Sequence, residues 1–484
     1  MIKEEIFQLI RDNFNLSPTG GQETAMHHLA AFLSSAKQSP LYLLKGYAGT
    51  GKTTIVATLV RILPYIGMQC VLLAPTGRAA KVLQNYSGIQ AFTIHRKIYY
   101  HRINADGTVK LIVIPNQHKN TLFIVDEASM IGDSSRESAF FRSKNLLDDL
   151  MQYVQEGEHC RLMLIGDHAQ LPPVGSDLSP ALDLQYLKTT YAVTAAAFEL
   201  TEVMRQSLES GILYNATRLR DKLINEDFEL PLFNLNGFTD IIKLSGEEFE
   251  DLMYDAFGEK DYGKAVIICR SNRMANNYNN AIRSRILGYD GQITGGDLLM
   301  VVKNNYFWAA ESMAQGQSEN ALSFIANGDM VVVNRISRIE EYYGFRFADA
   351  DISFIDYPEQ PAMQVKLLLD TLMAEGPSLN EEDYRKLAAA IEEEYSDIPN
   401  RNTRIRKIRN NPFYNALQVK YGYAITCHKT QGGQWEQVVV DGAGLKTETI
   451  DVAYLRWLYT AITRATNKLM LVNFSDEVYS SSMN

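Results

Sequence analysis

Short apolar runs alternate with helical patterns through the first two hundred residues of the chain. Four of these runs have the composition of buried strands, and they cover residues 41–45, 69–74, 121–126 and 161–167. Each run is followed by a glycine-rich or polar turn, and most of the turns lead into a helical pattern. Because parallel strands need helical crossovers, the alternation predicts an α/β domain with a parallel sheet over residues 1–200.

Residues 97–118 interrupt this alternation. They contain two strand-like runs on either side of Asp106-Gly107, a dipeptide that favours a hairpin turn. The segment is therefore predicted to be a β-hairpin insertion that projects from the sheet.

The α/β pattern restarts after residue 200 and is interrupted once more. Several short strands with Gly-Asp turns predict a small barrel, and residues 371–410 follow as an acidic helix and the basic run RNTRIRKIR. We assign residues 201–288 and 411–484 to a second α/β domain. The β-rich insertion with its helical extension then takes residues 289–410.

Length and composition fit a globular protein of several domains. A chain of 484 residues is too long for one core, and 46% apolar and 21% charged residues are ordinary values. No apolar run reaches the roughly 20 residues that span a bilayer, and the start of the chain is unlike a secretory signal, so a cytoplasmic location without a membrane partner is expected. The net charge of −10 still allows a basic channel on an acidic exterior.

The four cysteines are far apart in the sequence. None of them belongs to a C-x-x-C pair, so neither a disulfide framework nor a zinc ribbon is expected. Cys427 precedes His428, which leaves open whether the two form a catalytic pair, half of a metal site or neither.

The strongest chemical signal is GYAGTGKTT, residues 46–54, which contains G-x-x-x-x-G-K-[ST]. It lies between a predicted strand and a predicted helix, where backbone N–H groups turn toward phosphates. Lys52 would reach the β- and γ-phosphates of a nucleotide, and the Thr53 hydroxyl would hold Mg²⁺. The predicted nucleotide-binding residues of this loop are Gly46, Ala48, Gly49, Thr50, Gly51, Lys52, Thr53 and Thr54.

Two acidic residues end the predicted strand at 121–126. Asp126 could hold the metal ion, and Glu127 could orient and deprotonate an attacking water molecule. A strand that ends in two acids is common. With the phosphate loop about 75 residues upstream, the pair predicts a nucleoside triphosphatase.

Five segments then follow one another in the order of the superfamily 1 helicase motifs: VDEASM with LIGDHAQLPPVG, TEVMRQ, ITCHKTQGGQ and YTAITRATNKLMLV. The chain resembles the RecD-like and Dda-like group of this superfamily over most of residues 17–210 and 412–475. The resemblance implies two RecA-like P-loop domains with parallel sheets, a β-hairpin insertion and an SH3-like β-rich insertion. It also implies an ATP-dependent motor that moves 5′ to 3′ on single-stranded DNA.

The resemblance assigns roles to residues near the nucleotide. Gln22 resembles the glutamine that reads the adenine edge, and Gln170 the glutamine that links the γ-phosphate to the DNA site. Arg205 and Arg464 resemble the two arginines that reach the γ-phosphate from the second domain, and Gly432 lies near the nucleotide. A planar guanidinium suits charge that develops on phosphate oxygens. If Lys52 and Arg464 contact one nucleotide, that nucleotide lies between two domains.

Candidate DNA contacts follow two strand ends. Thr76 and Arg78 precede a helix in a place suited to a backbone phosphate, and Thr93 and His95 stand at a similar position. Each could equally be a structural residue. The hairpin, with Tyr99, Tyr100 and His101, resembles the strand-separating pin of the family, although paired tyrosines are also ordinary in a sheet.

The stretch ITCHKTQGG resembles the family's T-x-H-K-x-Q-G, which lies along the DNA groove. On a strand, Thr426, His428 and Thr430 would share one face and Cys427 would turn into the core, so Cys427 and His428 would not form a pair. We therefore predict His428 and Thr430 as DNA contacts and Cys427 as a packing residue.

Two segments of the insertion stay ambiguous from sequence. YYGFRF could stack on bases or fill the core of the barrel, and the core is favoured. RNTRIRKIR could follow phosphates or balance the neighbouring acids, and the helical stretch 371–410 departs from the family pattern.

The predicted protein is thus an ATP- and Mg²⁺-dependent helicase that acts as a monomer on single-stranded DNA and duplex junctions. Single-strand-binding or repair proteins are candidate partners. The alternatives are a translocase that displaces proteins or acts on RNA, and a P-loop switch without processive movement.

Overall fold

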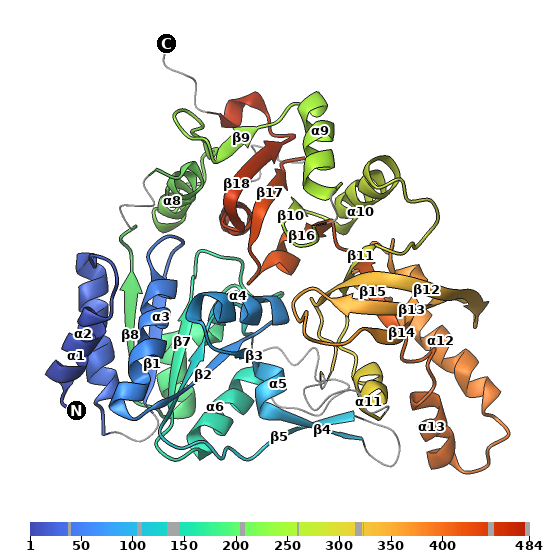
Figure 1. Ribbon diagram of the computed structural model, residues 1–484, viewed down its shortest axis with the longest axis horizontal. Coiled ribbons are helices and arrows are strands. Elements are labelled where there is room, and N and C mark those ends of the chain that lie inside the picture. Colours follow the sequence, from blue (N-terminus) through green and yellow to red (C-terminus); the bar gives the residue numbers. More distant parts are fainter. Residues whose placement is uncertain are drawn as a thin grey trace.

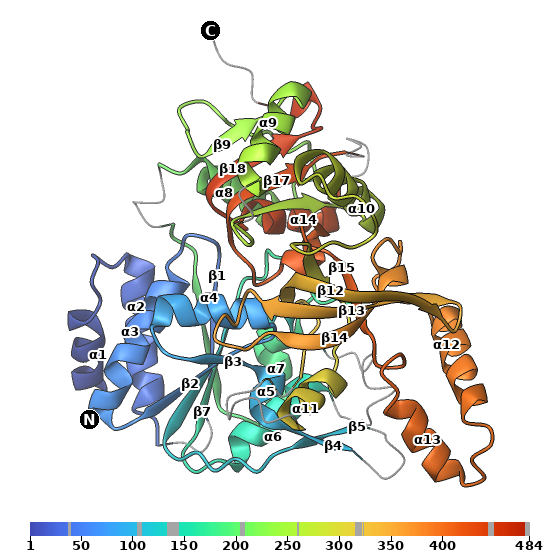
Figure 2. The ribbon, with the colours of Figure 1, turned by 45° about the vertical axis from the view of Figure 1, so that its right-hand side comes forward.

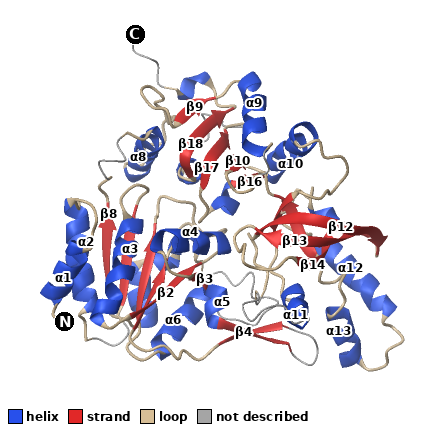
Figure 3. Ribbon diagram, viewed as in Figure 1, coloured by secondary structure: helices blue, strands red, loops and turns tan. Residues whose placement is uncertain are grey.

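The computed structural model describes residues 1–36, 40–103, 109–132, 145–203, 209–258, 261–314, 322, 324–443 and 450–479 (Figure 1). The predicted γ-phosphate contact Arg205 and the predicted turn Asp106-Gly107 lie outside these residues. The strands form four separate sheets, which are one in each α/β domain, a closed barrel and a two-stranded hairpin. Figure 3 shows these strands in red and the helices in blue.

The first domain is a six-stranded parallel sheet with the order β3-β2-β6-β7-β1-β8. All four predicted strands are present. Edge strands β3 and β8 were not predicted, because β3 has only three residues and the sequence AAAFEL of β8 is half-exposed and rich in alanine. The strands are β1 (Leu41–Gly46), β2 (Gln69–Ala74), β3 (Ala91–Thr93), β6 (Thr121–Val125), β7 (Arg161–Gly166) and β8 (Ala195–Leu200).

Helices cover both faces of this sheet, and a separate apolar core fills each side. One core packs the sheet against α1, α2 and α3, and the other packs it against α5, α6 and α7. The helices are α1 (Lys3–Asp12), α2 (Gly20–Leu33), α3 (Lys52–Ile62), α4 (Gly77–Ser87), α5 (Ile94–Ile98), α6 (Leu146–Glu156) and α7 (Leu184–Tyr191).

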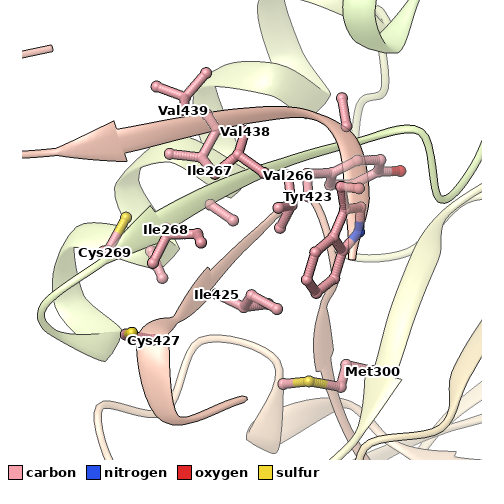
Figure 4. Packing of buried hydrophobic residues seen from close by; sticks show 14 of the residues in the cluster. Val266, Ile267, Ile268, Cys269, Met300, Tyr423, Ile425, Cys427, Val438 and Val439 are labelled. Atoms are coloured by element: carbon pink, nitrogen blue, oxygen red, sulfur yellow. The ribbon is translucent and has the colours of Figure 1, made fainter. Parts of the chain in front are cut away.

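The second domain is a five-stranded parallel sheet with the order β16-β10-β17-β18-β9. Its core is built from β-branched side chains of β10 and β17 together with Ile425 and Cys427 (Figure 4). The strands are β9 (Ile241–Lys243), β10 (Ala265–Cys269), β16 (Ala424–Thr426), β17 (Trp435–Asp441) and β18 (Ala465–Val472). The helices are α8 (Gly211–Ile224), α9 (Gly246–Phe257), α10 (Asn272–Ala281) and α14 (Val452–Ile462).

The β-rich insertion is a closed five-stranded barrel, as predicted. Its strands are β11 (Leu298–Val301), β12 (Met330–Tyr342), β13 (Phe345–Phe354), β14 (Met363–Leu368) and β15 (Leu417–Tyr421). The fifth strand comes from beyond residue 410, after the helical extension. The domain limits themselves stay a prediction.

The turn between β12 and β13 explains the segment YYGFRF. Tyr343 and Gly344 both have positive φ, at 54° and 76°, which is the conformation of a two-residue hairpin turn. Phe345 and Phe347 point into an apolar cluster with Leu387 of α12, so the favoured interpretation of this segment as core is confirmed for these two side chains.

The helical extension and the hairpin complete the described fold. The extension contains α12 (Glu381–Glu394) and α13 (Arg401–Arg409), which project from the barrel, and α11 (Phe307–Ala314) lies below it (Figure 2). The hairpin strands β4 (Tyr99–Ile103) and β5 (Val109–Val113) are antiparallel, as predicted. Across the described residues, no helix combines the length and the apolar character that crossing a bilayer requires.

Candidate active site

The phosphate loop lies between β1 and α3, as predicted. Gly49 and Gly51 have φ of 74° and 85°, a left-handed conformation that glycine adopts without strain. Lys52 begins α3, and its Nζ donates hydrogen bonds to the carbonyl oxygens of Gly46 at 2.6 Å and Tyr47 at 2.8 Å. The lysine side chain therefore folds back over the loop, where it can exchange these carbonyls for phosphate oxygens.

A cavity of about 370 Å³ opens in front of the loop, and both α/β domains line it. From the first domain come the loop, the acids after β6 and Gln170. From the second domain come Gly432 and Arg464. The predicted residues that line the cavity are Ala48, Gly49, Gly51, Lys52, Thr53, Thr54, Asp126, Glu127, Gln170, Gly432 and Arg464.

Gln22 and Thr50 lie behind the loop rather than in the cavity. The Gln22 amide donates to the carbonyl oxygen of Thr50 at 3.0 Å, and its oxygen accepts from the backbone N–H of Thr19 at 3.0 Å. The Thr50 hydroxyl donates to the carbonyl oxygen of Tyr47 at 2.8 Å. Both side chains are buried and hold the shape of the loop. In this geometry the amide of Gln22 is already used by the protein, and adenine reading stays a prediction.

The two acids after β6 have different surroundings. The Asp126 carboxylate accepts hydrogen bonds from the Tyr86 hydroxyl at 2.6 Å and from the backbone N–H of Glu127 at 2.8 Å. Glu127 has φ of 53°, which turns its side chain into the cavity. Burial raises the pKa of Glu127 above its usual range, while the guanidinium of Arg464 acts in the opposite direction. A raised carboxyl pKa suits a group that accepts a proton.

Arg464 brings the second domain to the first. It follows α14, is 4% exposed, and its Nη1 lies 3.9 Å from Oε1 of Glu127. Its guanidinium also donates to the carbonyl oxygens of Thr460 at 3.0 Å and Gly433 at 3.2 Å. These contacts hold the planar group toward the space in front of the phosphate loop.

Two further residues connect the domains, and sequence reasoning missed both. The Tyr459 hydroxyl donates to Oδ2 of Asp167 at 2.6 Å and accepts from the backbone N–H of Ala48 at 2.8 Å. The position of Asp167 at the end of β7 was a visible signal, since polar residues at strand ends line such sites. Tyr459 begins the segment YTAITRATNKLMLV and lies in the last turn of α14, but nothing in the sequence indicated that its hydroxyl would contact the first domain.

The segment after β7 carries further contacts between these domains. Gln170 is 8% exposed, and its Oε1 has no hydrogen-bond partner among the described residues. The next residue, Leu171, donates from its backbone N–H to the hydroxyl of Thr460 at 2.8 Å and accepts from the amide of Gln431 at 2.6 Å. The segment thus touches both the cavity and the loop that contains Gly432.

The prediction that an extended strand continues through residues 427–430 is wrong. Strand β16 ends at Thr426, and Cys427–Thr430 form a 3-10 turn, so side chains no longer alternate between two faces. Cys427 is fully buried, as predicted, and burial raises its pKa to about 12. Thr430 is also fully buried and donates to the carbonyl oxygen of Cys427 at 2.7 Å, whereas His428 is exposed. The expected shared face of His428 and Thr430 is therefore absent.

The predicted phosphate contacts on α4 and α5 have protein partners. The hydroxyl of Thr76 accepts from the backbone N–H of Ala79 at 3.3 Å, and that of Thr93 accepts from Arg96 at 3.1 Å, so both cap helices. The His95 ring is half-buried beside Tyr99, and burial lowers its pKa to about 4. His95 is then neutral at neutral pH and offers no positive charge.

Arg78 joins three parts of the molecule. Its guanidinium donates to the carbonyl oxygen of Gln434 at 3.0 Å, lies 4.1 Å from the ring centre of Trp435, and is 3.8 Å from Asp356 of the barrel. Burial lowers its pKa, with Asp356 opposing. Direct phosphate contact by Arg78, Thr76, Thr93 or His95 stays a prediction.

Barrel residues cover the start of α4. Lys81 donates to the carbonyl oxygen of Ile355 at 2.7 Å and lies 3.7 Å from Asp356. A methyl group at Gly77 would lie only 2.7 Å from Oδ1 of Asp329, so this buried carboxylate stands directly against the first residue of α4. Burial raises the pKa of Asp329 to about 7. In this structure the barrel closes over the predicted DNA-contacting face.

The geometry defines a P-loop protein with two RecA-like domains and a nucleotide-sized cavity between them. A family model described as an AAA domain matches residues 18–230, and one described as a UvrD-like helicase C-terminal domain matches residues 421–472. These two matches fall on the two halves of the cavity. The chain belongs to the RecD and Dda group of superfamily 1 helicases.

Individual relatives are distant. The ATP-dependent RecD2 DNA helicase of Deinococcus radiodurans is 33% identical over 187 residues, which are 39% of this chain and 22% of that protein. The ATP-dependent DNA helicase dda of Enterobacteria phage T4 is 26% identical over 293 residues, 58% of this chain and 60% of that protein. The chain thus matches less than two thirds of either relative.

Among solved structures, Pif1 helicase from Bacteroides in complex with ADP-AlF3 and ssDNA is similar, with 14% identity and a TM-score of 0.45. The similarity covers 97% of this chain and 95% of that one.

Proposed function

We propose that this protein is an ATP-dependent DNA helicase that moves 5′ to 3′ on single-stranded DNA. The observation that carries the proposal is the cavity shared by Lys52 and Glu127 of the first domain and Arg464 of the second. A nucleotide bound there contacts both domains, so its hydrolysis changes how strongly they are held together. The two curated relatives are named as ATP-dependent DNA helicases, which supports the choice of DNA.

Each residue of the cavity has a proposed task. Lys52 leaves its two carbonyl partners and binds the β- and γ-phosphates. Glu127 orients and deprotonates the attacking water, and its raised pKa makes the carboxylate a stronger base. Arg464, and Arg205 by resemblance, stabilise the charge that develops on the γ-phosphate. Oε1 of Gln170, which has no hydrogen-bond partner among the described residues, can accept a hydrogen bond from the attacking water.

The residues also fit a magnesium ion bound with the nucleotide. Thr53 and Asp126 both line the cavity, and Mg²⁺ in such sites is held by one or two protein oxygens together with phosphates and water. Among the described residues there is no group of three acidic, histidine or cysteine side chains that could hold a metal alone, which agrees with a nucleotide-dependent site. Held by Thr53 and Asp126, the ion would supply positive charge that offsets the negative charge of the phosphates during hydrolysis.

The hairpin is proposed to meet the duplex junction. Tyr99 anchors it, because its hydroxyl donates to Asp149 at 2.8 Å and the residue is buried. Tyr100 is 60% exposed and is available to stack on a base. The side chain of His101 lies outside the described residues. Duplex junctions are therefore proposed as substrates beside single-stranded DNA.

Tailed duplexes test the proposal. ATP hydrolysis should rise strongly with single-stranded DNA, and a duplex with a 5′ tail should be unwound while one with a 3′ tail is not. Unwinding of the 3′-tailed duplex alone would reverse the polarity. Hydrolysis that no single strand stimulates would contradict a DNA motor and point to a P-loop switch. Displacement of a protein bound to single-stranded DNA tests the alternative of a protein-displacing translocase. Stimulation of hydrolysis by an RNA strand tests the alternative of movement on RNA.

A further inference from the structure

The basic helix α13 is a part of the molecule that the motor described above does not use. It carries five basic residues and no acidic one, in a chain whose net charge is −10. The structure allows a decision between the two interpretations of RNTRIRKIR, which are charge balance with neighbouring acids and a surface for phosphates.

Charge balance explains only one of the five cations at short range. Arg404 lies 3.8 Å from Glu392 of α12, and it is the one residue of α13 with an acidic partner within 4 Å in the described part of the chain. The acids at the start of α12 are paired within their own helix, by Arg385 with Glu381 and by Lys386 with Glu382 at 2.9 Å. Most cations of α13 are therefore not paired with the acidic side chains of α12.

The orientation of α13 separates a packed side from a free side. Ile408 packs against the cluster that contains Phe345 and Phe347, and Arg404 on the same side faces α12. With about 100° between successive residues, Arg406 lies on the opposite side of the helix and Lys407 lies on the flank between the two sides. Both side chains are exposed, and the described residues offer them no hydrogen bond or ion pair.

Helix polarity alone does not require this arrangement. Cations in the last turn of a helix are favoured by the helix dipole, but that effect is worth only about 0.3–1 kcal/mol at an exposed site. The arm formed by residues 381–409 has seven acidic and seven basic residues. Most of its acids lie on α12 and most of its cations on α13, so the arm presents a positive surface on one side.

The position of α13 suggests which anion it meets. In both views of the ribbon, the hairpin strands β4 and β5 extend toward α13 (Figures 1 and 2). If the hairpin separates the strands, the duplex that has not yet been opened lies beyond the hairpin, on the side of α13. A duplex carries one negative charge per roughly 1.7 Å of its axis, and cations that approach it release counterions.

We propose that Arg406 and Lys407 of α13 bind the phosphate backbone of the duplex ahead of the junction. This inference rests on the proposed helicase function and adds a duplex-binding surface to it. The binding is independent of sequence, because lysine and arginine contacts to phosphates carry no base information.

A matched pair of double variants tests the inference. Arg406→Gln with Lys407→Gln removes two adjacent exposed cations of the four on α13 that have no acidic partner within 4 Å among the described residues. Arg385→Gln with Lys386→Gln makes the same change on the neighbouring helix, where both cations already have acidic partners. The affinity of each protein is measured over a range of salt concentrations, for a 5′-tailed duplex and for a single strand of the tail length.

The α13 variant should bind the tailed duplex more weakly at low salt, and its slope of log K against log salt should fall by about 1.8, from two lost phosphate contacts. Its affinity for the single strand and its strand-stimulated ATP hydrolysis should not change. The α12 variant should match the wild type on both substrates.

Two results would overturn the inference. One is a duplex affinity and salt slope that the α13 substitutions leave unchanged, which would point to an acidic protein partner or to a solvated surface. The other is an equal loss on single strand and duplex, which would mean a general charge effect. Failure of the helicase proposal is distinguished separately, because it appears as a lack of strand-stimulated hydrolysis in the wild-type protein.

Discussion

The first domain makes two large contacts, and they differ in kind. Toward the second α/β domain it leaves a cavity of about 370 Å³ lined by Lys52, Glu127 and Arg464. Toward the barrel, Arg78, Asp329 and their neighbours are packed against protein groups. The first contact encloses a cavity that a nucleotide can enter, whereas side chains of the barrel and of α4 lie directly against each other in the second. A nucleotide can therefore be held within the first contact, and the predicted DNA contacts on α4 would require the barrel to move.

The first prediction concerns a substitution that affects only the contact at the nucleotide. Arg464→Ala should lower the rate of ATP hydrolysis by about 10³–10⁵, by analogy with arginine fingers, because no other described cation of the second domain approaches Glu127 within 4 Å. Single-turnover hydrolysis with saturating DNA measures the loss. Lys468→Ala on the adjoining strand β18 is the control and should retain the wild-type rate. A loss below tenfold in Arg464→Ala would remove this residue from the reaction.

The second prediction concerns only the contact with the barrel, through the pKa of Asp329. Its pKa is about 7 in the folded protein and 3.8 in the reference state, so the protein binds its proton more tightly when folded. The stabilising effect of that proton is complete below about pH 4 and is lost as the pH rises to about 7. Asp329→Asn should therefore raise the free energy of unfolding by up to about 4 kcal/mol at pH 8 and by little at pH 4.

Urea unfolding at the two pH values measures this difference. Asp290→Asn replaces an exposed aspartate and should show no such pH-dependent gain. An equal effect of Asp329→Asn at both pH values would show that the buried carboxyl is not the titrating group. ATP hydrolysis without DNA should stay unchanged in Asp329→Asn, because the residue lies outside the cavity.

The third prediction concerns the point where the two contacts meet. Gly432 lines the cavity, has φ of 73°, and a methyl group there would lie 2.6 Å from Cβ of Ala79 on α4. Gly432→Ala should weaken the contact between the second domain and α4 by about 1–3 kcal/mol. The KM for ATP should rise about tenfold. Gly237→Ala has a similar φ of 80° with open space around it, so it carries only the backbone strain. Equal KM values for the two variants would contradict a close approach at Gly432.

The comparison also shows why one site was visible in the sequence and the other was not. The phosphate loop is a contiguous segment whose glycines, lysine and threonine act together, so nine residues were enough to place it. Asp126 and Glu127 were visible because parallel strands end at one edge of a sheet. Arg464 needed the resemblance, since nothing local distinguishes it from a surface arginine.

The contact with the barrel depends on residues that are distant in the sequence. Asp329 and Asp356 lie more than 250 positions from Thr76 and Arg78, and no periodicity links them. The error at Cys427–Thr430 has a different cause: the strand pattern was correct up to Thr426, and the change to a 3-10 turn leaves no mark in a stretch of mixed polarity. Edge strands β3 and β8 were missed because short or half-exposed strands lack a strong apolar pattern.

The connection between the barrel and the second domain limits how the molecule can move. Only Gly422 and Tyr423 separate β15 of the barrel from β16 of the sheet, and Leu298 of β11 donates its backbone N–H to the Tyr423 hydroxyl at 3.0 Å. On the entering side of the barrel, Arg283 and Asp297 form a buried ion pair at 2.7 Å. Both connections between the barrel and the second sheet are therefore short or held by buried contacts. We expect the barrel and the second sheet to rotate together as one unit. A rotation that moved the barrel away from α4 together with the second sheet would change the distance between Arg464 and Glu127.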